Sequence, residues 1–167
     1  IDMGDFLPPD PQLLEKKLEQ DPHISHVILI HCETSSGILN PIKTISKIVK
    51  SFNRSLLIDS MSAFGAIPID CAEIEFDALV SSANKCIEGV PGFGFVLTKK
   101  SVLEKSKNNS HSLSLDLYDQ WKYMEEKGQW RFTPPTHTIL GFLSALNQHE
   151  SEGGVLGRLN RYEANKN

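Results

Sequence analysis

Residues 55–85 read SLLIDSMSAFGAIPIDCAEIEFDALVSSANK, and this stretch decides the fold. It contains two short apolar runs, residues 55–58 (SLLI) and 77–80 (DALV), and each run leads directly into polar residues. Such runs are too short for helices and are typical of strands buried in a sheet. The first run ends at Asp59, and the second continues through a small, hydroxyl-rich segment to Lys85.

The segments on either side alternate between strand and helix patterns. Residues 26–30 (HVILI) and 95–98 predict two further strands, whereas 12–20 and 42–49 place leucines or isoleucines at helical spacing. Three more helices are expected at 114–127, 136–150 and 153–165. This alternation predicts an α/β fold with a mostly parallel, mixed sheet flanked by helices.

The composition is that of an ordinary globular protein. The chain has 167 residues, of which 40% are hydrophobic, enough for one domain with a buried core. Its 17 basic and 21 acidic side chains give a net charge of −4 without a basic cluster, so we expect no nucleic-acid partner. No apolar run approaches the roughly 20 residues that span a bilayer, so we expect no membrane partner.

The cysteines and the first residue bear on the compartment. Three cysteines without a C-x-x-C pair favour a reducing compartment, which we interpret as the cytoplasm. The chain begins with Ile1, so we expect it to start inside a longer protein. His23, His26, His31 and Cys32 lie in a segment with turn and strand character rather than on one helical face, and we expect no metal site.

Polar residues follow three of the predicted strands at the point where each strand ends. The first strand leads into residues 31–37 (HCETSSG), the second into Asp59, and the third into the segment that carries Lys85. A doubly wound sheet would bring these carboxyl ends onto one edge, where α/β proteins bind their ligands.

Asp59 and Lys85 each have a structural interpretation and a catalytic one. Asp59 follows an apolar strand, so its carboxylate is expected to reach water, cap residues 60–63 or meet a cation. Lys85 is the only lysine between Lys50 and Lys99 and has small or apolar neighbours, which predicts that it is buried and therefore more nucleophilic. Their joint presence near a hydroxyl-rich loop favours catalysis.

An acid paired with a nucleophilic lysine is what pyridoxal phosphate requires. The lysine forms a Schiff base with the cofactor aldehyde, and the acid keeps the pyridine nitrogen protonated so that the ring accepts electrons. A carboxylate about 4 Å from a pyridinium stabilises it by about 4 kcal/mol at an effective dielectric constant near 20. We therefore expect pyridoxal 5′-phosphate as the cofactor.

Four segments together carry a family resemblance: 31–37 (HCETSSG), 56–65 (LLIDSMSAFG), 81–96 (SSANKCIEGVPGFGFV) and 131–142 (RFTPPTHTILGF). In this order they resemble the class V group of fold-type I aminotransferases. The resemblance implies that residues 1–127 belong to the large cofactor-binding domain and that 128–167 continue it toward a small C-terminal domain outside the chain. It also implies a homodimer for the full-length protein.

The resemblance assigns roles by position. Lys85 matches the Schiff-base lysine, which also carries the proton between substrate and cofactor, and Asp59 matches the partner of the pyridine nitrogen. Thr34 matches the residue that bonds the phenolic oxygen of the cofactor, and Ser82 and Asn84 are expected to be pocket residues. Thr133 and Thr136 lie in a segment that resembles a loop reaching the cofactor phosphate of a partner subunit. Alternatively, Thr136 is simply the N-cap of the next helix.

The implied activity is amino transfer between a small-molecule amine and a 2-oxo acid. The resemblance favours 2-aminoethylphosphonate as donor and pyruvate as acceptor, giving phosphonoacetaldehyde and L-alanine. Another class V aminotransferase of the alanine– or serine–glyoxylate type is the alternative, and a non-catalytic fragment that keeps the fold is a second. The arginine expected to hold the acidic group of the substrate is not matched by Arg131, Arg158 or Arg161, and we expect it outside this chain.

Overall fold

A four-stranded sheet forms the centre of the molecule. The computed structural model describes residues 1–4 and 6–166, and its strands follow the chain order: β1 (His26–Ile30), β2 (Ser55–Asp59), β3 (Ala78–Ser82) and β4 (Gly94–Thr98). β1, β2 and β3 are parallel, and β4 is antiparallel to β3. The predicted mixed sheet is confirmed.

The strand order differs in one respect from the expectation. The four described strands follow one another in space as they do in sequence, so this sheet is not doubly wound and the strand order does not reverse within it. The carboxyl ends of β1, β2 and β3 still share one edge, because parallel pairing alone is sufficient to align them.

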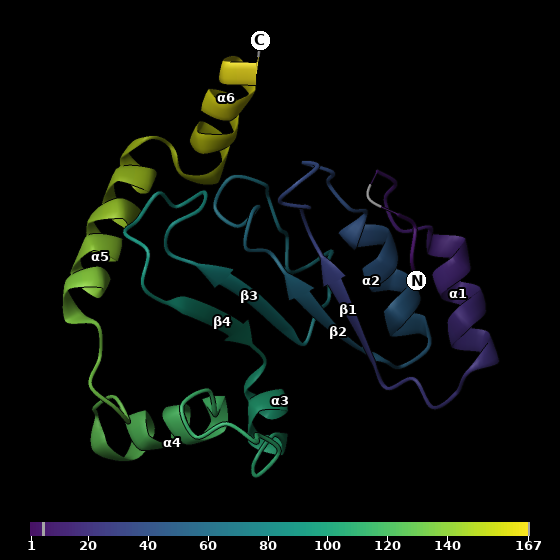
Figure 1. Ribbon diagram of the computed structural model, residues 1–167, viewed down its shortest axis with the longest axis horizontal. Helices are drawn as coiled ribbons and strands as arrows, with labels where there is room; N and C mark the ends of the chain where they lie inside the picture. The colour runs from purple at the N-terminus through teal and green to yellow at the C-terminus, as the bar shows by residue number, and fades with distance from the viewer. Residues whose placement is uncertain (5, 167) are drawn as a thin grey trace.

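Two helices cover the β1–β2 end of the sheet (Figure 1). α1 (Pro11–Gln20) begins after Asp10, whose side chain accepts a hydrogen bond of 2.8 Å from the backbone of Gln12. α2 (Ile42–Ser51) connects β1 to β2 as the expected crossover helix. The apolar faces of both helices meet the sheet and bury a core of aliphatic side chains: Leu14, Leu18, Leu29, Ile42, Ile45, Val49, Leu56, Ile58, Ile74 and Leu79.

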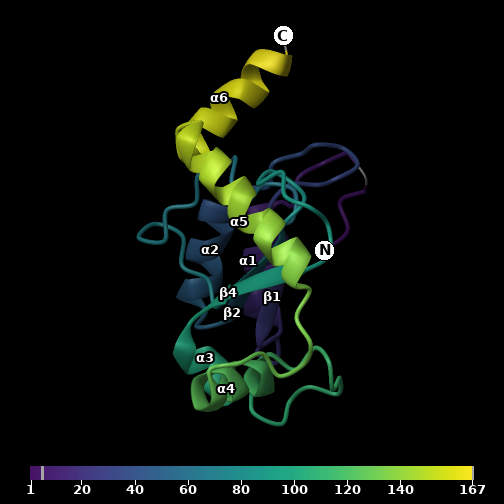
Figure 2. The ribbon, with the colours of Figure 1, turned by 90° about the vertical axis from the view of Figure 1, so that its left-hand side faces the viewer.

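The other end of the sheet carries the second half of the chain. A short helix that the sequence pattern did not predict, α3 (Lys100–Lys105), follows β4, and α4 (Leu117–Lys127) comes next. α5 (Thr136–Ser151) lies beyond β4, and α6 (Gly154–Lys166) extends from it at an angle (Figures 1 and 2). Phe142 on α5 packs against Phe93 and Phe95, with ring centroids 5.2 and 5.7 Å away.

The helices and cysteines also bear on two sequence expectations. Across residues 1–4 and 6–166, no helix combines the length and the apolar character that crossing a membrane requires. Cys32, Cys71 and Cys86 are free thiols.

Candidate functional site

The carboxyl ends of the three parallel strands lie at the same level. Ile30, Asp59 and Val80 are register partners across β1, β2 and β3. The backbone continues the pairing one residue further, because His31 N–H donates to Asp59 O at 2.7 Å and Ser60 N–H donates to Val80 O at 2.9 Å. The loops after the three strands therefore begin side by side.

Asp59 is half-buried at the end of the central strand of the three. Its Oδ1 accepts a hydrogen bond of 2.9 Å from the backbone N–H of Met61, so the capping role expected from the sequence is present. Its Oδ2 makes no hydrogen bond to any residue that the structure describes. One carboxylate oxygen thus orients the side chain, while the other is available to a ligand.

Lys85 lies in the tight turn that follows β3. The turn is closed by two backbone hydrogen bonds of 2.8 Å, from Glu88 to Lys85 and from Gly89 to Ala83. A Cβ at Gly89 would lie 2.8 Å from Ala83 O, so the turn requires glycine at that position. The amine of Lys85 makes no hydrogen bond or ion pair with the rest of the described chain, which leaves it free for chemistry.

The expectation that Lys85 is buried is wrong for this chain. Its apolar neighbours Ala83, Cys86 and Ile87 are buried, but they point into the protein, while Asn84 and Lys85 point out of the turn and are exposed. The apolar residues around Lys85 anchor the turn to the protein, and they do not surround the amine.

Ser62 links the three polar loops. Thr34 Oγ1, from the loop after β1, lies 2.7 Å from Ser62 Oγ. Cys86 Sγ, next to Lys85, donates to Ser62 O at 3.4 Å. Ser62 was not among the predicted site residues, although Ser62 lies three residues after Asp59 in the segment that carries the family resemblance. Through Ser62, the loops that hold Thr34, Asp59 and Lys85 form one connected surface.

A buried polar layer lies beneath this surface. His31 is only 3% exposed, and its Nδ1 lies 3.0 Å from Ser60 Oγ. Burial lowers the pKa of His31, so the neutral ring is favoured there. Burial also raises the pKa of the Cys32 and Cys86 thiols, which favours their neutral form. Among the described residues, no group of three or more His, Cys, Asp or Glu side chains is arranged to hold a metal ion.

Of the other four predicted site residues, two lie beside Lys85 in the chain and two lie in a separate segment. Ser82 is half-buried at the end of β3, where it pairs with Gly94 of β4, and Asn84 is exposed in the Lys85 turn. Thr133 and Thr136 are exposed, in the loop after α4 and at the start of α5. Within the described chain, no hydrogen bond joins either threonine to the loops that carry Asp59 and Lys85.

Thr136 is not a helix N-cap, so that alternative is wrong. Pro135 occupies the N-cap position of α5, and no side chain accepts a capping hydrogen bond there. The backbone N–H of Thr136 instead donates to Pro134 O at 2.9 Å. Thr136 is the first residue inside α5, and its exposed hydroxyl makes no hydrogen bond to the described chain.

The donor set at this edge fits pyridoxal phosphate. It contains a carboxylate with an unoccupied oxygen, an unpaired primary amine and the hydroxyl group of Thr34, all on loops joined through Ser62. An acid suits a protonated ring nitrogen, an amine suits an aldehyde, and a hydroxyl suits a phenolic oxygen. The same set offers nothing that would bind a metal preferentially.

Comparisons with known proteins agree with this fit. The model of the family described as "Aminotransferase class-V" matches residues 3–162. The 2-aminoethylphosphonate–pyruvate transaminase of Rhizobium meliloti is 59% identical over 166 residues, which are 99% of this chain and 43% of that protein. The chain thus spans less than half the length of the curated relatives it matches.

Solved structures share the fold. The pyridoxamine–pyruvate aminotransferase of Mesorhizobium loti superposes with a TM-score of 0.78 at 27% identity, over 87% of this chain and 38% of that one. The alanine–glyoxylate aminotransferase of Nostoc sp. superposes with a TM-score of 0.80 at 22% identity, over 95% of this chain and 42% of that one. The second likeness concerns the fold alone.

Proposed function

The chain belongs to the aminotransferase class V family, and from that premise we propose that the full-length protein is a pyridoxal-phosphate-dependent transaminase for 2-aminoethylphosphonate and pyruvate. The observation that carries the proposal is the connected polar edge, where Asp59 ends β2 and Lys85 occupies the turn after β3. The names of relatives at 49–59% identity over nearly the whole chain supply the substrates.

Each residue at the edge has a defined role in this proposal. Pyridoxal phosphate, when bound, supplies an aldehyde and an electron-accepting ring. Lys85 would hold the cofactor through its amine and would also move the proton at the substrate carbon. Asp59 uses its free Oδ2 to hold the proton on the ring nitrogen, while Met61 keeps its other oxygen in place. Thr34, whose Oγ1 lies 2.7 Å from Ser62 Oγ, would bond the phenolic oxygen of the cofactor through its hydroxyl group.

The remaining predicted residues complete the proposed pocket and the assembly. Ser82, at the end of β3, and Asn84, in the turn that carries Lys85, would line the cofactor pocket. Residues 1–127 form part of the cofactor-binding domain, and 128–167 continue it, since α5 packs against β4 through Phe142. In a homodimer, the exposed Thr133 and Thr136 reach the cofactor phosphate of the partner subunit. We place the protein in the cytoplasm, in keeping with its free thiols.

Reductive trapping tests the lysine. Full-length protein is mixed with pyridoxal phosphate, reduced with borohydride and digested, and the modified peptide is identified by mass spectrometry. We expect the label on Lys85. Lys99, exposed at the opposite end of the neighbouring strand β4, is the internal control and should stay unlabelled. A label on any other lysine would remove the central assignment.

A matched pair of substitutions tests the acid. Asp59→Asn keeps an oxygen to accept the Met61 N–H but cannot hold the ring nitrogen protonated, so kcat should fall by at least about 100-fold. Asp70 is the control, because its Oδ1 caps Ala72 N–H at 2.8 Å in the same way but at an exposed site away from the edge. Asp70→Asn should leave kcat within about twofold. Equal effects of the two substitutions would contradict the role of Asp59.

The amino donor and acceptor are tested with the same protein. Alanine formation from 2-aminoethylphosphonate and pyruvate is compared with glycine formation from alanine or serine and glyoxylate. Faster turnover with glyoxylate would replace the proposed substrates by those of another class V aminotransferase and leave the cofactor site unchanged.

A further inference from the structure

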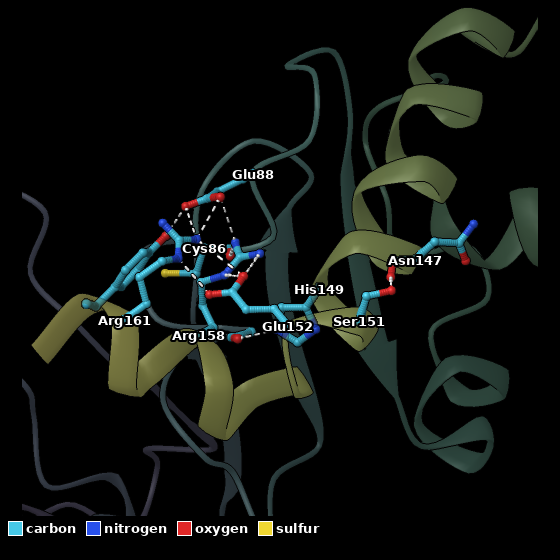
Figure 3. Close-up of polar contacts among 10 residues, drawn as sticks. Cys86, Glu88, Asn147, His149, Ser151, Glu152, Arg158 and Arg161 are labelled. Carbon is cyan, nitrogen blue, oxygen red and sulfur yellow. Dashed lines mark hydrogen bonds and ion pairs between the residues drawn. The ribbon is translucent and has the colours of Figure 1, made fainter. Parts of the chain in front are cut away.

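Arg158 is the most deeply buried charged side chain among the residues that the structure describes. It lies on α6 and is only 2% exposed. Its Nε and Nη2 bond Glu152 Oε2 at 2.8 and 2.7 Å, and its Nη1 bonds Cys86 O at 2.5 Å (Figure 3). Cys86 directly follows Lys85, so the guanidinium holds the backbone beside the proposed cofactor lysine from a helix 72 residues further along the chain.

Glu88 fastens the same turn a second time. Its carboxylate lies 3.1 Å from Arg158 Nη1 and 2.9 Å from Arg161 Nη2, and it accepts a bond of 2.9 Å from Tyr162 Oη. Glu88 has a positive φ of 60°, in the left-handed region that residues with a side chain seldom adopt. The side chains of α6 thus hold Glu88 in a strained conformation that closes the Lys85 turn.

The ion pairs in this cluster are present at neutral pH. Hydrogen bonds from Arg161 hold the pKa of Glu152 below its usual range. Partial burial by itself would raise the pKa of Glu88, but hydrogen bonds from Arg161 and Tyr162 hold it below the ordinary value. Both carboxylates are therefore ionised where the enzyme would work.

The junction between α5 and α6, which we call the α5–α6 corner, also contacts the loop after Asp59. His149, near the end of α5, is buried, and its Nε2 lies 2.6 Å from Gly65 O. Gly65 and Ile87 touch, because a Cβ at Gly65 would lie 2.4 Å from Ile87 Cδ1. The α5–α6 corner thus contacts both loops whose relative position the proposed chemistry requires.

We propose that Arg158 is a positioning residue for Lys85: it fixes the Lys85 turn against the α5–α6 corner, and so sets the amine relative to Asp59. The role rests on the proposed function, because it assumes that Lys85 is the cofactor lysine. An arginine is suited to this role because its planar fork satisfies a carboxylate and a backbone carbonyl together, which a lysine amine cannot do in the same geometry.

Substitution of Arg158 in the full-length protein tests the role. Arg158→Met should lower kcat by about 10- to 100-fold with little change in KM, because a turn displaced by about 1 Å impairs the reaction more than substrate binding. It should also change the visible circular dichroism of the bound cofactor, which reports the orientation of the ring. Arg158→Lys, which restores the charge without the fork, should recover only part of kcat.

Arg161→Met is the matched control. Arg161 binds the same two carboxylates, Glu88 and Glu152, but no hydrogen bond joins it to the backbone beside Lys85 in the described chain. In Arg161→Met, Glu88 keeps its contacts to Arg158 and Tyr162 and the bond from Arg158 to Cys86 O is intact, so kcat should stay within about threefold of the wild type and the circular dichroism should be unchanged. Equal losses from Arg158→Met and Arg161→Met, or an unchanged kcat in Arg158→Met, would overturn the proposal.

Hydrogen exchange keeps the test decisive if Arg158→Met does not fold. In the wild-type protein, the amides of Glu88 and Gly89 close the turn, and we expect them to exchange as slowly as the amides of α6. Arg158→Lys should accelerate their exchange at least about tenfold, which corresponds to about 1.4 kcal/mol. Fast exchange of both amides in the wild type would show that α6 does not hold the turn.

The two proposals fail separately. Trapping on another lysine would refute the function of Lys85 while leaving the exchange result intact. A protected turn together with an unchanged kcat in Arg158→Met would refute the positioning role while leaving Lys85 as the cofactor lysine.

Discussion

Different interactions attach the helices at the two ends of the sheet. At the β1–β2 end, α1 and α2 bury aliphatic side chains such as Leu18, Ile45 and Leu56, each at most 2% exposed. At the β3–β4 end, the innermost side chains of α5 and α6 include Arg158 and His149, which form directional hydrogen bonds to loop carbonyls. The first end is a scaffold, and the second end aligns the loops.

The difference follows from what each interaction specifies. Burial of apolar surface contributes about 1.5–3 kcal/mol for each large side chain but tolerates small shifts. A buried arginine contributes little net stability, because desolvation offsets its ion pairs, yet it fixes geometry through its fork. We call the β1–β2 end the apolar end and the β3–β4 end the polar end. We expect substitutions at the apolar end to act mainly on stability. Substitutions at the polar end should act mainly on the alignment of Asp59 and Lys85.

The largest loss of stability is expected from Leu18→Ala. Leu18 is 2% exposed in the core between α1 and the sheet, so its truncation should lower the free energy of unfolding by about 2–5 kcal/mol. Leu13 on the same helix is 44% exposed, and Leu13→Ala should cost less than about 1 kcal/mol. Urea denaturation of the full-length protein measures both, and similar losses would mean that the aliphatic core does not hold this end.

A smaller loss of stability, with a larger effect on activity, is expected from Gly157→Ala. A Cβ at Gly157 would lie 2.0 Å from Glu152 O, so the backbone at the α5–α6 corner must shift. We expect a loss of about 1–3 kcal/mol, together with a lower kcat because Arg158 is the next residue. Exposed Asn160 on the same helix is the control, and Asn160→Ala should stay within about 0.5 kcal/mol. Wild-type kcat in Gly157→Ala would contradict the importance of the corner.

The contrast also explains which features could be predicted from the sequence. At the apolar end, the spacing of Ile42, Ile45 and Val49 sufficed to predict α2, because burial of one helix face leaves a periodic pattern in the sequence. The apolar run of residues 26–30 predicted β1, although Leu29 is the only buried residue of that strand. The short polar helix α3 was missed because none of its residues is buried, and such a helix carries no apolar stripe.

At the polar end, the sequence predicted α5 and α6 but not their contacts. The bond between Arg158 and Cys86 O joins residues 72 apart, and no local pattern marks it. The burial expected for Lys85 was wrong for the same reason: its apolar neighbours are anchored by distant helices, and the amine lies outside that packing. The site residues could be named from the family resemblance, whereas the side chains that hold them in place could not.

Low pH should destabilise the polar end of the sheet more than the apolar end. The pKa values of Glu88 and Glu152 lie below the ordinary value of about 4.3 in the folded protein, so their ionised forms stabilise the fold above that pH. This stabilisation is lost as the pH falls through the folded pKa values, because the carboxylates then take up protons and release the arginines. The protection factors of the amides in α6 and in the Lys85 turn should therefore fall as the pH is lowered below about 4.3.

The β1 and β2 amides should remain protected under the same conditions. Glu75, whose pKa is lowered by hydrogen bonds from Lys50 and Lys99, also loses its partners in acid, but its ion pairs lie at the surface beside an apolar core that does not titrate. Simultaneous loss of protection in β1, β2 and α6 would show that the two ends unfold as one unit.

The smallest effect is expected from an ion pair at the apolar end. Lys43 Nζ lies 2.7 Å from Glu73 Oε2, the same distance as Arg158 Nη2 from Glu152 Oε2, but Lys43 and Glu73 are 49% and 53% exposed. Water already solvates both charges, so Lys43→Met should change the free energy of unfolding by less than about 1 kcal/mol. Urea denaturation at low and high salt measures it, and a loss above about 2 kcal/mol would mean that solvent exposure does not weaken this ion pair.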